Sequence, residues 1–249
     1  MRFQRKRGFY ERYVKRLLDI LCALMAFLVF GWLFILVAVL VRINLGTPVI
    51  FQQPRPGFIK NGKEQIFTLY KFRTMTDERD ENGKLLPDDR RLTKFGKMLR
   101  ATSLDELPEA INILRGDMSV VGPRPQLVRD MVFMTDEQHL RHTARPGLSG
   151  LAQVMGRNAI CWNEKLNWDL KYIDRISFCG DLKIVLLTIK QVFFQKGRTD
   201  SSEEIDLTLD YGDALLKAGK VSKSQYDMLQ KQARNLIQEY KESVRCYEE

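Results

Sequence analysis

Residues 20–41 read ILCALMAFLVFGWLFILVAVLV, and this uncharged stretch decides the fold. A helix rises about 1.5 Å per residue, so the stretch would reach roughly 33 Å, close to the hydrocarbon thickness of a bilayer. A cleaved signal peptide fits poorly, because the apolar run is too long and no small-residue cleavage site precedes Arg42. The sequence therefore predicts a membrane helix, with a buried helix of a soluble protein as the alternative.

Basic residues on both sides of this run bear on its topology. Those before it are Arg2, Arg5, Lys6, Arg7, Arg12, Lys15 and Arg16, and those after it are Arg42, Arg55, Lys60, Lys63, Lys71 and Arg73. The first group favours a cytoplasmic N-terminus, but two basic flanks leave no clear inside–outside asymmetry. A helix that bends near Gly31 and returns to the same face would explain both flanks. A straight spanning helix also stays open, because glycine is common in membrane helices.

The whole chain is basic, with a formal net charge of +9 and a pI near 9.4. This balance favours polyanionic partners such as nucleic acid, anionic lipid headgroups or phosphate-rich small molecules, although a merely basic surface gives the same charge. The four cysteines are far apart and form no CxxC pair. Because His139 and His142 are the only histidines, we predict no structural zinc site and interpret both as surface or structural residues.

The sequence predicts an α+β fold that is mainly helical and has three segments. Residues 1–44 hold the basic N-terminus and the membrane helix, residues 45–197 form a small domain, and residues 198–249 form an acidic linker and a helical tail hinged at a glycine. Short strands are expected at residues 49–51 and 66–72, separated by a turn-rich stretch.

Helices are predicted in the middle of the chain. One covers about residues 91–112 with a break, and Ser103 would cap its second part because Glu106 follows three residues later. Residues 162–173 and 181–195 also predict helices. The last of these has an apolar face that packs on a core or lies among lipid headgroups.

The pair Asp105-Glu106 is the first candidate for chemistry. Consecutive residues of a helix point about 100° apart, so one carboxylate can attack while the other binds metal or protonates a leaving group. Phosphoryl transfer also needs fixed positive charge, which Arg100 would supply. A helix N-terminus would keep Asp105 ionised. By itself such a pair is weak evidence, because most Asp-Glu pairs are solvated surface charge.

Basic residues in turn-rich or proline-flanked segments add to this pattern. They are Lys71, Arg73, Arg124, Arg145 and Arg157. Arginine suits phosphate because its planar fork contacts two oxygens at once. The sequence has no Walker loop, dinucleotide fingerprint or Ser-His-Asp arrangement. These features indicate an enzyme that handles phosphate.

A series of short motifs runs in order along residues 15–196. They are KRLLD (15–19), RPG (55–57), KFRTM (71–75), SLDELP (103–108), GDMS (116–119), VGPRP (121–125), RPG (145–147) and GRN (156–158). Together they resemble the bacterial sugar transferase family, the monotopic phosphoglycosyl transferases that start glycoconjugate assembly. So many motifs in one order argue against a chance match.

The resemblance implies a mechanism. Asp105 would attack the β-phosphate of a UDP-sugar, releasing UMP and leaving a phosphosugar-aspartyl intermediate. Polyprenyl phosphate, in its undecaprenyl form, would then take up the sugar phosphate. Glu106, with Asp105, would hold Mg²⁺. The resemblance assigns the contacts to phosphate or nucleotide to Arg100, Arg124, Arg157, Lys71 and Arg73, and a further active-site carboxylate to Asp169.

The resemblance also implies a location. The catalytic domain would lie on the cytoplasmic face of the bacterial inner membrane, anchored by a re-entrant helix and interfacial helices, with membrane lipids and no nucleic acid as partners. The tail would serve self-association or partner docking. Gly31-Trp32 stands where family members carry Ser-Pro at the bend of the membrane helix, which bears on the topology. Residues 151–155 read LAQVM instead of the frequent WAQVN.

A non-enzymatic anchor that binds anionic lipid or nucleic acid is the competing hypothesis, and the stiff arginine loops argue against it.

Overall fold

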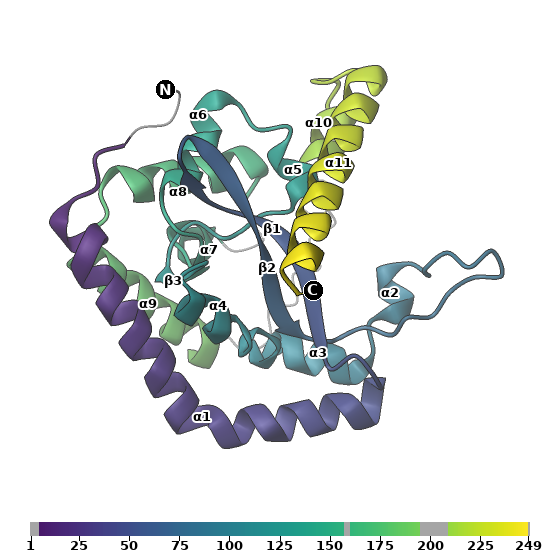
Figure 1. Ribbon diagram of the computed structural model, residues 1–249, viewed down its shortest axis with the longest axis horizontal. Coiled ribbons are helices and arrows are strands. Elements are labelled where there is room, and N and C mark those ends of the chain that lie inside the picture. The colour runs from purple at the N-terminus through teal and green to yellow at the C-terminus, as the bar shows by residue number, and fades with distance from the viewer. Residues whose placement is uncertain (1–4, 157–159, 195–208, 249) are drawn as a thin grey trace. The chain divides into compact units, whose positions relative to one another are not determined.

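The computed structural model describes residues 5–156, 160–194 and 209–248 (Figure 1). The chain forms two compact units. One, here the Asp105 unit, contains Leu18–Gln53 and Thr68–Gly116, and the other, here the Asp169 unit, contains Met1–Leu17, Pro54–Phe67 and Asp117–Glu249. The predicted segment boundaries near residues 44 and 197 stay a prediction, because compactness in space joins segments that are distant in sequence.

The described residues are mainly helical with a few strands. The first elements are a π-helical turn (Tyr10–Val14), α1 (Lys15–Leu45), β1 (Ile50–Lys60), β2 (Lys63–Phe72), α2 (Asp88–Arg91), α3 (Lys94–Ala101), a 3-10 turn (Leu104–Glu106) and α4 (Glu109–Arg115). The later elements are β3 (Ser119–Val121), α5 (Val128–Met131), α6 (Asp136–His139), a 3-10 turn (Leu140–Thr143), β4 (Gly147–Ser149), α7 (Leu151–Gly156), α8 (Trp162–Asp174), α9 (Phe178–Phe194), α10 (Tyr211–Lys217) and α11 (Lys223–Glu248). The predicted mainly helical α+β class is confirmed.

Helix α1 is the predicted membrane helix. With the π-helical turn before it, it is the one helix among the described residues that is long and apolar enough to cross a membrane. Only 11% of its most apolar 18-residue stretch is buried, which argues against a core helix of a soluble protein. Many of its apolar side chains are exposed, and six of them follow one another at spacings of three and four residues: Leu24, Leu28, Trp32, Ile35, Val39 and Ile43.

The course of α1 bears on its predicted topology. Figure 1 shows the helix bent within its length, although the helical assignment runs without a break from Lys15 to Leu45. A Cβ built on Gly31 would meet no atom within 4 Å, so close packing does not require glycine there. A bend by itself fits either a re-entrant or a spanning helix.

The core of the Asp105 unit fixes the strand and helix that carry the candidate site. Val37 and Val41 of α1 are buried with Phe72 of β2 and Leu99 of α3. The rings of Phe34 and Phe72 lie 4.9 Å apart between centroids. Burying each such side chain stabilises the fold by about 1.5–3 kcal/mol. The end of β2 and helix α3 are therefore held together by α1.

Strands β1 and β2 pair in a two-stranded sheet. Asn61 and Gly62 connect them, with φ of 51° and 75°, which is typical of the primed turns in two-residue hairpins. The strands are longer than predicted, and the turn-rich interpretation of residues 54–57 is wrong. A two-stranded sheet has only edge strands, so it tolerates Pro54 and Pro56.

The segment between α3 and α4 also differs from the prediction. Helix α3 begins at Lys94, where the Oγ1 of Thr93 accepts a hydrogen bond from the Gly96 amide at 3.0 Å. The capping role predicted for Ser103 is wrong. Ser103 has a left-handed backbone, with φ of 56°, and its side chain makes no capping bond. The chain turns sharply there and continues as a 3-10 turn that carries Asp105.

The Asp169 unit is built on a short parallel pair. Ser119 of β3 is in register with Gly147 of β4, and Val121 with Ser149. A Cβ on Gly147 would lie 2.0 Å from the Gly122 nitrogen, so the close approach of these two backbone segments requires glycine at position 147.

Helices α8 and α9 cover this pair and confirm the helices predicted at 162–173 and 181–195, except that residue 195 lies outside the described part. Tyr172 and Ile173 of α8 and Ile184 of α9 are buried with Val121. The exposed large apolar side chains of α9 are Phe178, Leu182, Leu186 and Ile189. One face of α9 therefore packs on the core while the other suits a lipid interface.

The tail forms the predicted helical hairpin. Helices α10 and α11 meet at Gly219, whose φ is 67°. Ala233 of α11 is buried against Val128 and Met131 of α5. The tail thus packs on its own chain, and its role in self-association stays a prediction. Most of the predicted acidic linker lies outside the described residues.

Candidate active site

Two acidic side chains on the 3-10 turn differ in their exposure. Asp105 is 7% exposed, whereas Glu106 is half-buried. The left-handed Ser103 reverses the chain just before them, and α4 begins three residues after Glu106. The turn thus presents two adjacent carboxylates in different surroundings, as their predicted different roles require.

Lys71 of β2 binds the acidic segment. Its Nζ lies 2.8 Å from Oε1 of Glu106 and 3.1 Å from Oε1 of Glu109. Glu109 opens α4 and is 2% exposed. Sequence reasoning missed Glu109, although its three-residue spacing from Glu106 places both on one side of a helical turn. A single ammonium group therefore pairs with two carboxylates next to Asp105.

The pKa of Asp105 is raised above its ordinary value. Burial is the largest cause, and the neighbouring Glu106 carboxylate adds to it, while the cationic Lys71 and Arg100 oppose it. Burial therefore opposes the effect predicted for a helix N-terminus, and the ionised state of Asp105 stays a prediction. A 3-10 turn of three residues has too few aligned peptides to offset desolvation.

The predicted arginines of the same unit have different surroundings. The Nε of Arg100, in the last turn of α3, donates to Oγ1 of Thr74 at 3.1 Å. Arg73 is 7% exposed. Its guanidinium donates to the carbonyls of Thr47 at 2.6 Å and Met75 at 2.9 Å, and pairs with a neighbouring carboxylate. Arg73 thus anchors the chain after β2, and its contact with substrate stays a prediction.

The other predicted residues lie elsewhere. Asp169 of α8 is 1% exposed and accepts hydrogen bonds from Nε and Nη2 of Arg141 at 3.0 and 2.6 Å. The same Nη2 donates to the carbonyl of Arg124 at 2.6 Å. Burial raises the pKa of Asp169, opposed by Arg141. Arg124 and Asp169 belong to the Asp169 unit, and Arg157 lies outside the described residues.

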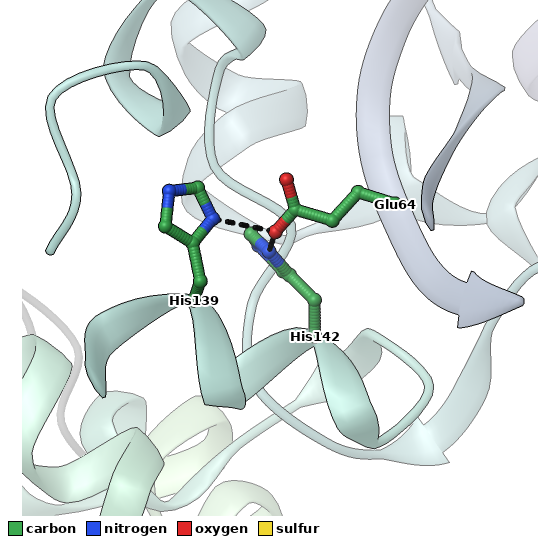
Figure 2. Close-up of side chains that lie close together, drawn as sticks. All are labelled: Glu64, His139 and His142. Atoms are coloured by element: carbon green, nitrogen blue, oxygen red, sulfur yellow. Dashed lines mark hydrogen bonds and ion pairs between the residues drawn. The ribbon is translucent and has the colours of Figure 1, made fainter. Parts of the chain in front are cut away.

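Both histidines of the chain contact a single carboxylate (Figure 2). The Nδ1 of His139 lies 2.6 Å from Oε1 of Glu64, and the Nδ1 of His142 contacts the same oxygen. The interpretation of His139 and His142 as surface or structural residues missed this convergence. Glu64 is 75 residues from His139 in sequence, so no local pattern relates them.

The chemistry of the Asp105 unit fits phosphoryl transfer. A buried carboxylate with a raised pKa is a strong nucleophile once ionised, because few water molecules solvate it. Carboxylate oxygens are the ligands that Mg²⁺ prefers, commonly one or two together with substrate phosphates. The side chain of Glu106 is 19% exposed, and its Oε1 already pairs with the ammonium of Lys71 at 2.8 Å. Its donor chemistry therefore fits Mg²⁺.

The chain is similar to known proteins over this region. A family profile described as bacterial sugar transferase matches residues 10–195. The uncharacterized sugar transferase EpsL of Bacillus subtilis (strain 168) is 47% identical over 184 residues, which cover 74% of this chain and 89% of EpsL. The UDP-N-acetylgalactosamine-undecaprenyl-phosphate N-acetylgalactosaminephosphotransferase of Aeromonas hydrophila is 37% identical over 189 residues, 72% of this chain and 44% of its own. The UDP-glucose:undecaprenyl-phosphate glucose-1-phosphate transferase of Klebsiella pneumoniae is 38% identical over 192 residues, 73% of this chain and 40% of its own.

Proposed function

Because the chain belongs to the bacterial sugar transferase family and is a phosphoglycosyl transferase, we propose that it moves a sugar 1-phosphate from a UDP-sugar to undecaprenyl phosphate through Asp105. The acceptor is taken from the relatives, whose names specify undecaprenyl phosphate. Those names differ in the sugar, N-acetylgalactosamine in one and glucose in the other. The proposal therefore specifies the donor only as a UDP-sugar.

The observation that carries the proposal is the buried Asp105 next to the ammonium of Lys71, which pairs with two other carboxylates, Glu106 and Glu109. In the first step a carboxylate oxygen of Asp105 bonds to the phosphorus that bears the sugar, and the bond from that phosphorus to the bridging oxygen breaks. UMP leaves with that oxygen. In the second step an oxygen of undecaprenyl phosphate attacks the same phosphorus, and Asp105 regains its carboxylate.

The surrounding residues stabilise charge in both steps. Glu106, with Asp105, would hold Mg²⁺, which would supply positive charge to offset the diphosphate. Lys71 places its ammonium against Glu106 and favours the ionised form of Asp105. Arg100 favours that form as well. These fixed charges cost no reorganisation during the reaction, which is how such sites lower a barrier.

The proposed location is the cytoplasmic face of the inner membrane, with α1 as a re-entrant anchor. The basic residues on both flanks support this topology, and the bend in α1 is compatible with it (Figure 1). Single cysteines placed before and after residues 20–41 should both react only from the cytoplasmic side. A label added from the periplasm at a position after residue 42 would exclude the re-entrant arrangement.

The direct test is release of UMP from UDP-sugars by the full chain in detergent. We expect release with undecaprenyl phosphate and Mg²⁺, loss of release on chelation, and loss in the Asp105→Asn variant. A panel of UDP-sugars identifies the donor. Full turnover by Asp105→Asn would refute the role of this carboxylate.

A further inference from the structure

The cluster of Glu64, His139 and His142 has no part in the chemistry proposed for Asp105. Glu64 is the second residue of β2. The histidines lie three residues apart on the turn formed by α6 and the 3-10 segment after it. Residues at this spacing share one side of a helical turn. Figure 2 shows both imidazole rings facing the carboxylate.

The donor set has the chemistry of a transition-metal site. One ligand atom from each of the three residues lies within 4.8 Å of the others. Two imidazole nitrogens with one carboxylate oxygen are a ligand set of zinc sites, whereas Mg²⁺ prefers oxygen donors alone. We propose that Glu64, His139 and His142 bind one divalent transition-metal ion, zinc or its chemical equivalent, which clamps the hairpin to the α6 turn.

The charge states of Glu64 and His142 suit this role. Burial alone would raise the pKa of Glu64, but hydrogen bonds with His139 and His142 lower it to about 2, so the carboxylate is ionised at neutral pH. Burial lowers the pKa of His142, which favours the neutral imidazole that a metal requires.

The geometry needs a small adjustment to hold the ion. Zinc bonds of about 2.0 Å in a tetrahedral site place two donors roughly 3.3 Å apart. Oε1 of Glu64 and Nδ1 of His139 are 2.6 Å apart, so they must separate by about 0.7 Å. Their side chains are 16% and 17% exposed, which leaves room for this movement, whereas His142 is 4% exposed and stays in place.

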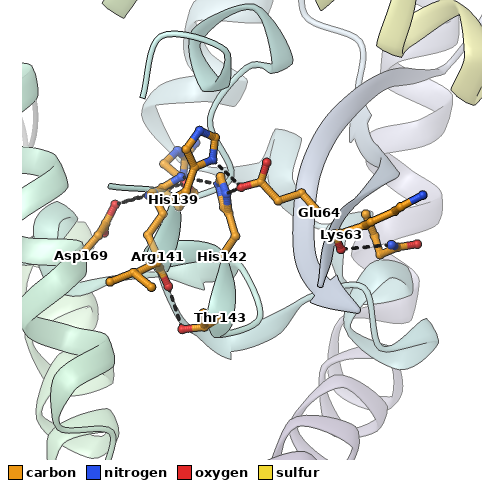
Figure 3. A network of polar contacts seen from close by, with 10 residues as sticks. Lys63, Glu64, His139, Arg141, His142, Thr143 and Asp169 are labelled. Atoms are coloured by element: carbon orange, nitrogen blue, oxygen red, sulfur yellow. Dashed lines mark hydrogen bonds and ion pairs between the residues drawn. The ribbon is translucent and has the colours of Figure 1, made fainter. Parts of the chain in front are cut away.

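A second contact of His142 must change as well (Figure 3). Nη1 of Arg141 lies 3.3 Å from Nε2 of His142. A guanidinium only donates, so Nε2 accepts there and the imidazole proton sits on Nδ1. Coordination through Nδ1 moves that proton to Nε2, and Nη1 releases the contact. Arg141 keeps its bonds to Asp169 and to the Arg124 carbonyl.

The chain itself offers the controls for a test. His139 and His142 are its only histidines, so a protein purified with a tag that lacks histidine has no other imidazole that could bind zinc. Its exposed cysteines could bind zinc adventitiously and are changed to serine in a control: Cys22, Cys161, Cys179 and Cys246. Glu137, exposed on α6, is changed to glutamine as a matched loss of charge outside the cluster.

The experiment titrates the full chain in detergent with Zn²⁺ against a coloured chelator. We expect one ion per chain, an affinity weakened at least about tenfold in Glu64→Gln and His139→Ala, and an unchanged affinity in Glu137→Gln and in the cysteine-free chain. Excess Mg²⁺ should not displace the ion. Zinc should also raise the melting temperature of the parent but not of Glu64→Gln. No binding by the parent, equal binding by all variants, or loss of binding without cysteines would each overturn the proposal.

Discussion

Replacing Lys71 with methionine should destabilise the protein and weaken catalysis through one identifiable set of charges. Methionine keeps most of the length of lysine and an unbranched apolar stem but removes the ammonium. The ammonium lies 2.8 Å from Glu106 and 3.1 Å from Glu109. Without it, two carboxylates on one side of a helical turn repel each other.

The size of the effect follows from burial. Breaking a fully buried ion pair costs about 3–5 kcal/mol. The side chain of Glu109 is 3% exposed, but those of Lys71 and Glu106 are 18% and 19% exposed, so water compensates part of the loss. We expect a loss of about 2–3 kcal/mol, which corresponds to a fall of roughly 5–10 °C in melting temperature for a chain of this size.

The activity of Lys71→Met should change with pH in a defined direction. Lys71 is the largest of the influences that lower the pKa of Asp105. Its removal raises that pKa further, so the acid limb of the UMP-release profile should move to higher pH. Thermal unfolding in detergent and a pH–rate profile measure the two effects.

Two further variants separate the causes. Lys63→Met removes an exposed lysine of the same strand and should change neither quantity. The double variant Lys71→Met/Glu109→Gln should recover part of the lost stability, because the buried carboxylate is gone, but not the activity. An unchanged melting temperature together with an unshifted acid limb in Lys71→Met would refute the reasoning.

Other expectations concern single positions. UMP release should fall as the pH drops through the raised pKa of Asp105, which lies above the ordinary 3.8 of an aspartate. An acid limb of the pH–rate profile at or below 3.8 would contradict the argument that burial raises this pKa. Asp105→Asn should keep or raise the melting temperature near neutral pH, because a raised pKa means that ionising this group opposes folding. Gly96→Ala should lower the melting temperature, because its Cβ would lie 1.9 Å from a backbone carbonyl oxygen, whereas Gly31→Ala should be neutral or stabilising, since nothing lies within 4 Å. Arg141→Met should cost about 3–5 kcal/mol of folding free energy, since it removes the partner of the buried Asp169; a melting temperature equal to that of the parent would contradict it.

The sequence predicted the long elements because their signals are local. The uncharged run of α1 and the apolar face of α9 each come from neighbouring residues. The hairpin was underestimated because Pro54 and Pro56 usually interrupt strands, whereas an edge strand tolerates them. The break near Ser103 was expected, but its left-handed backbone was not, because serine rarely adopts that conformation.

Contacts between distant segments were beyond the sequence pattern. Arg141 and Asp169 are 28 residues apart, and Glu64 and His142 are 78 apart. Neither periodicity nor motif spacing relates residues at such separations, because the tertiary fold alone brings them together. The burial that raises the pKa of Asp105 was beyond the sequence for the same reason, since it depends on packing that local sequence does not encode.

Exchange of labelled UMP into a UDP-sugar, without any lipid acceptor, tests the role of Asp105 most directly. A covalent intermediate on this carboxylate predicts exchange by the parent chain, none by Asp105→Asn, and a phosphosugar mass on the peptide that contains residue 105. Transfer to undecaprenyl phosphate by a parent chain that shows no exchange, or exchange that persists in Asp105→Asn, would contradict it.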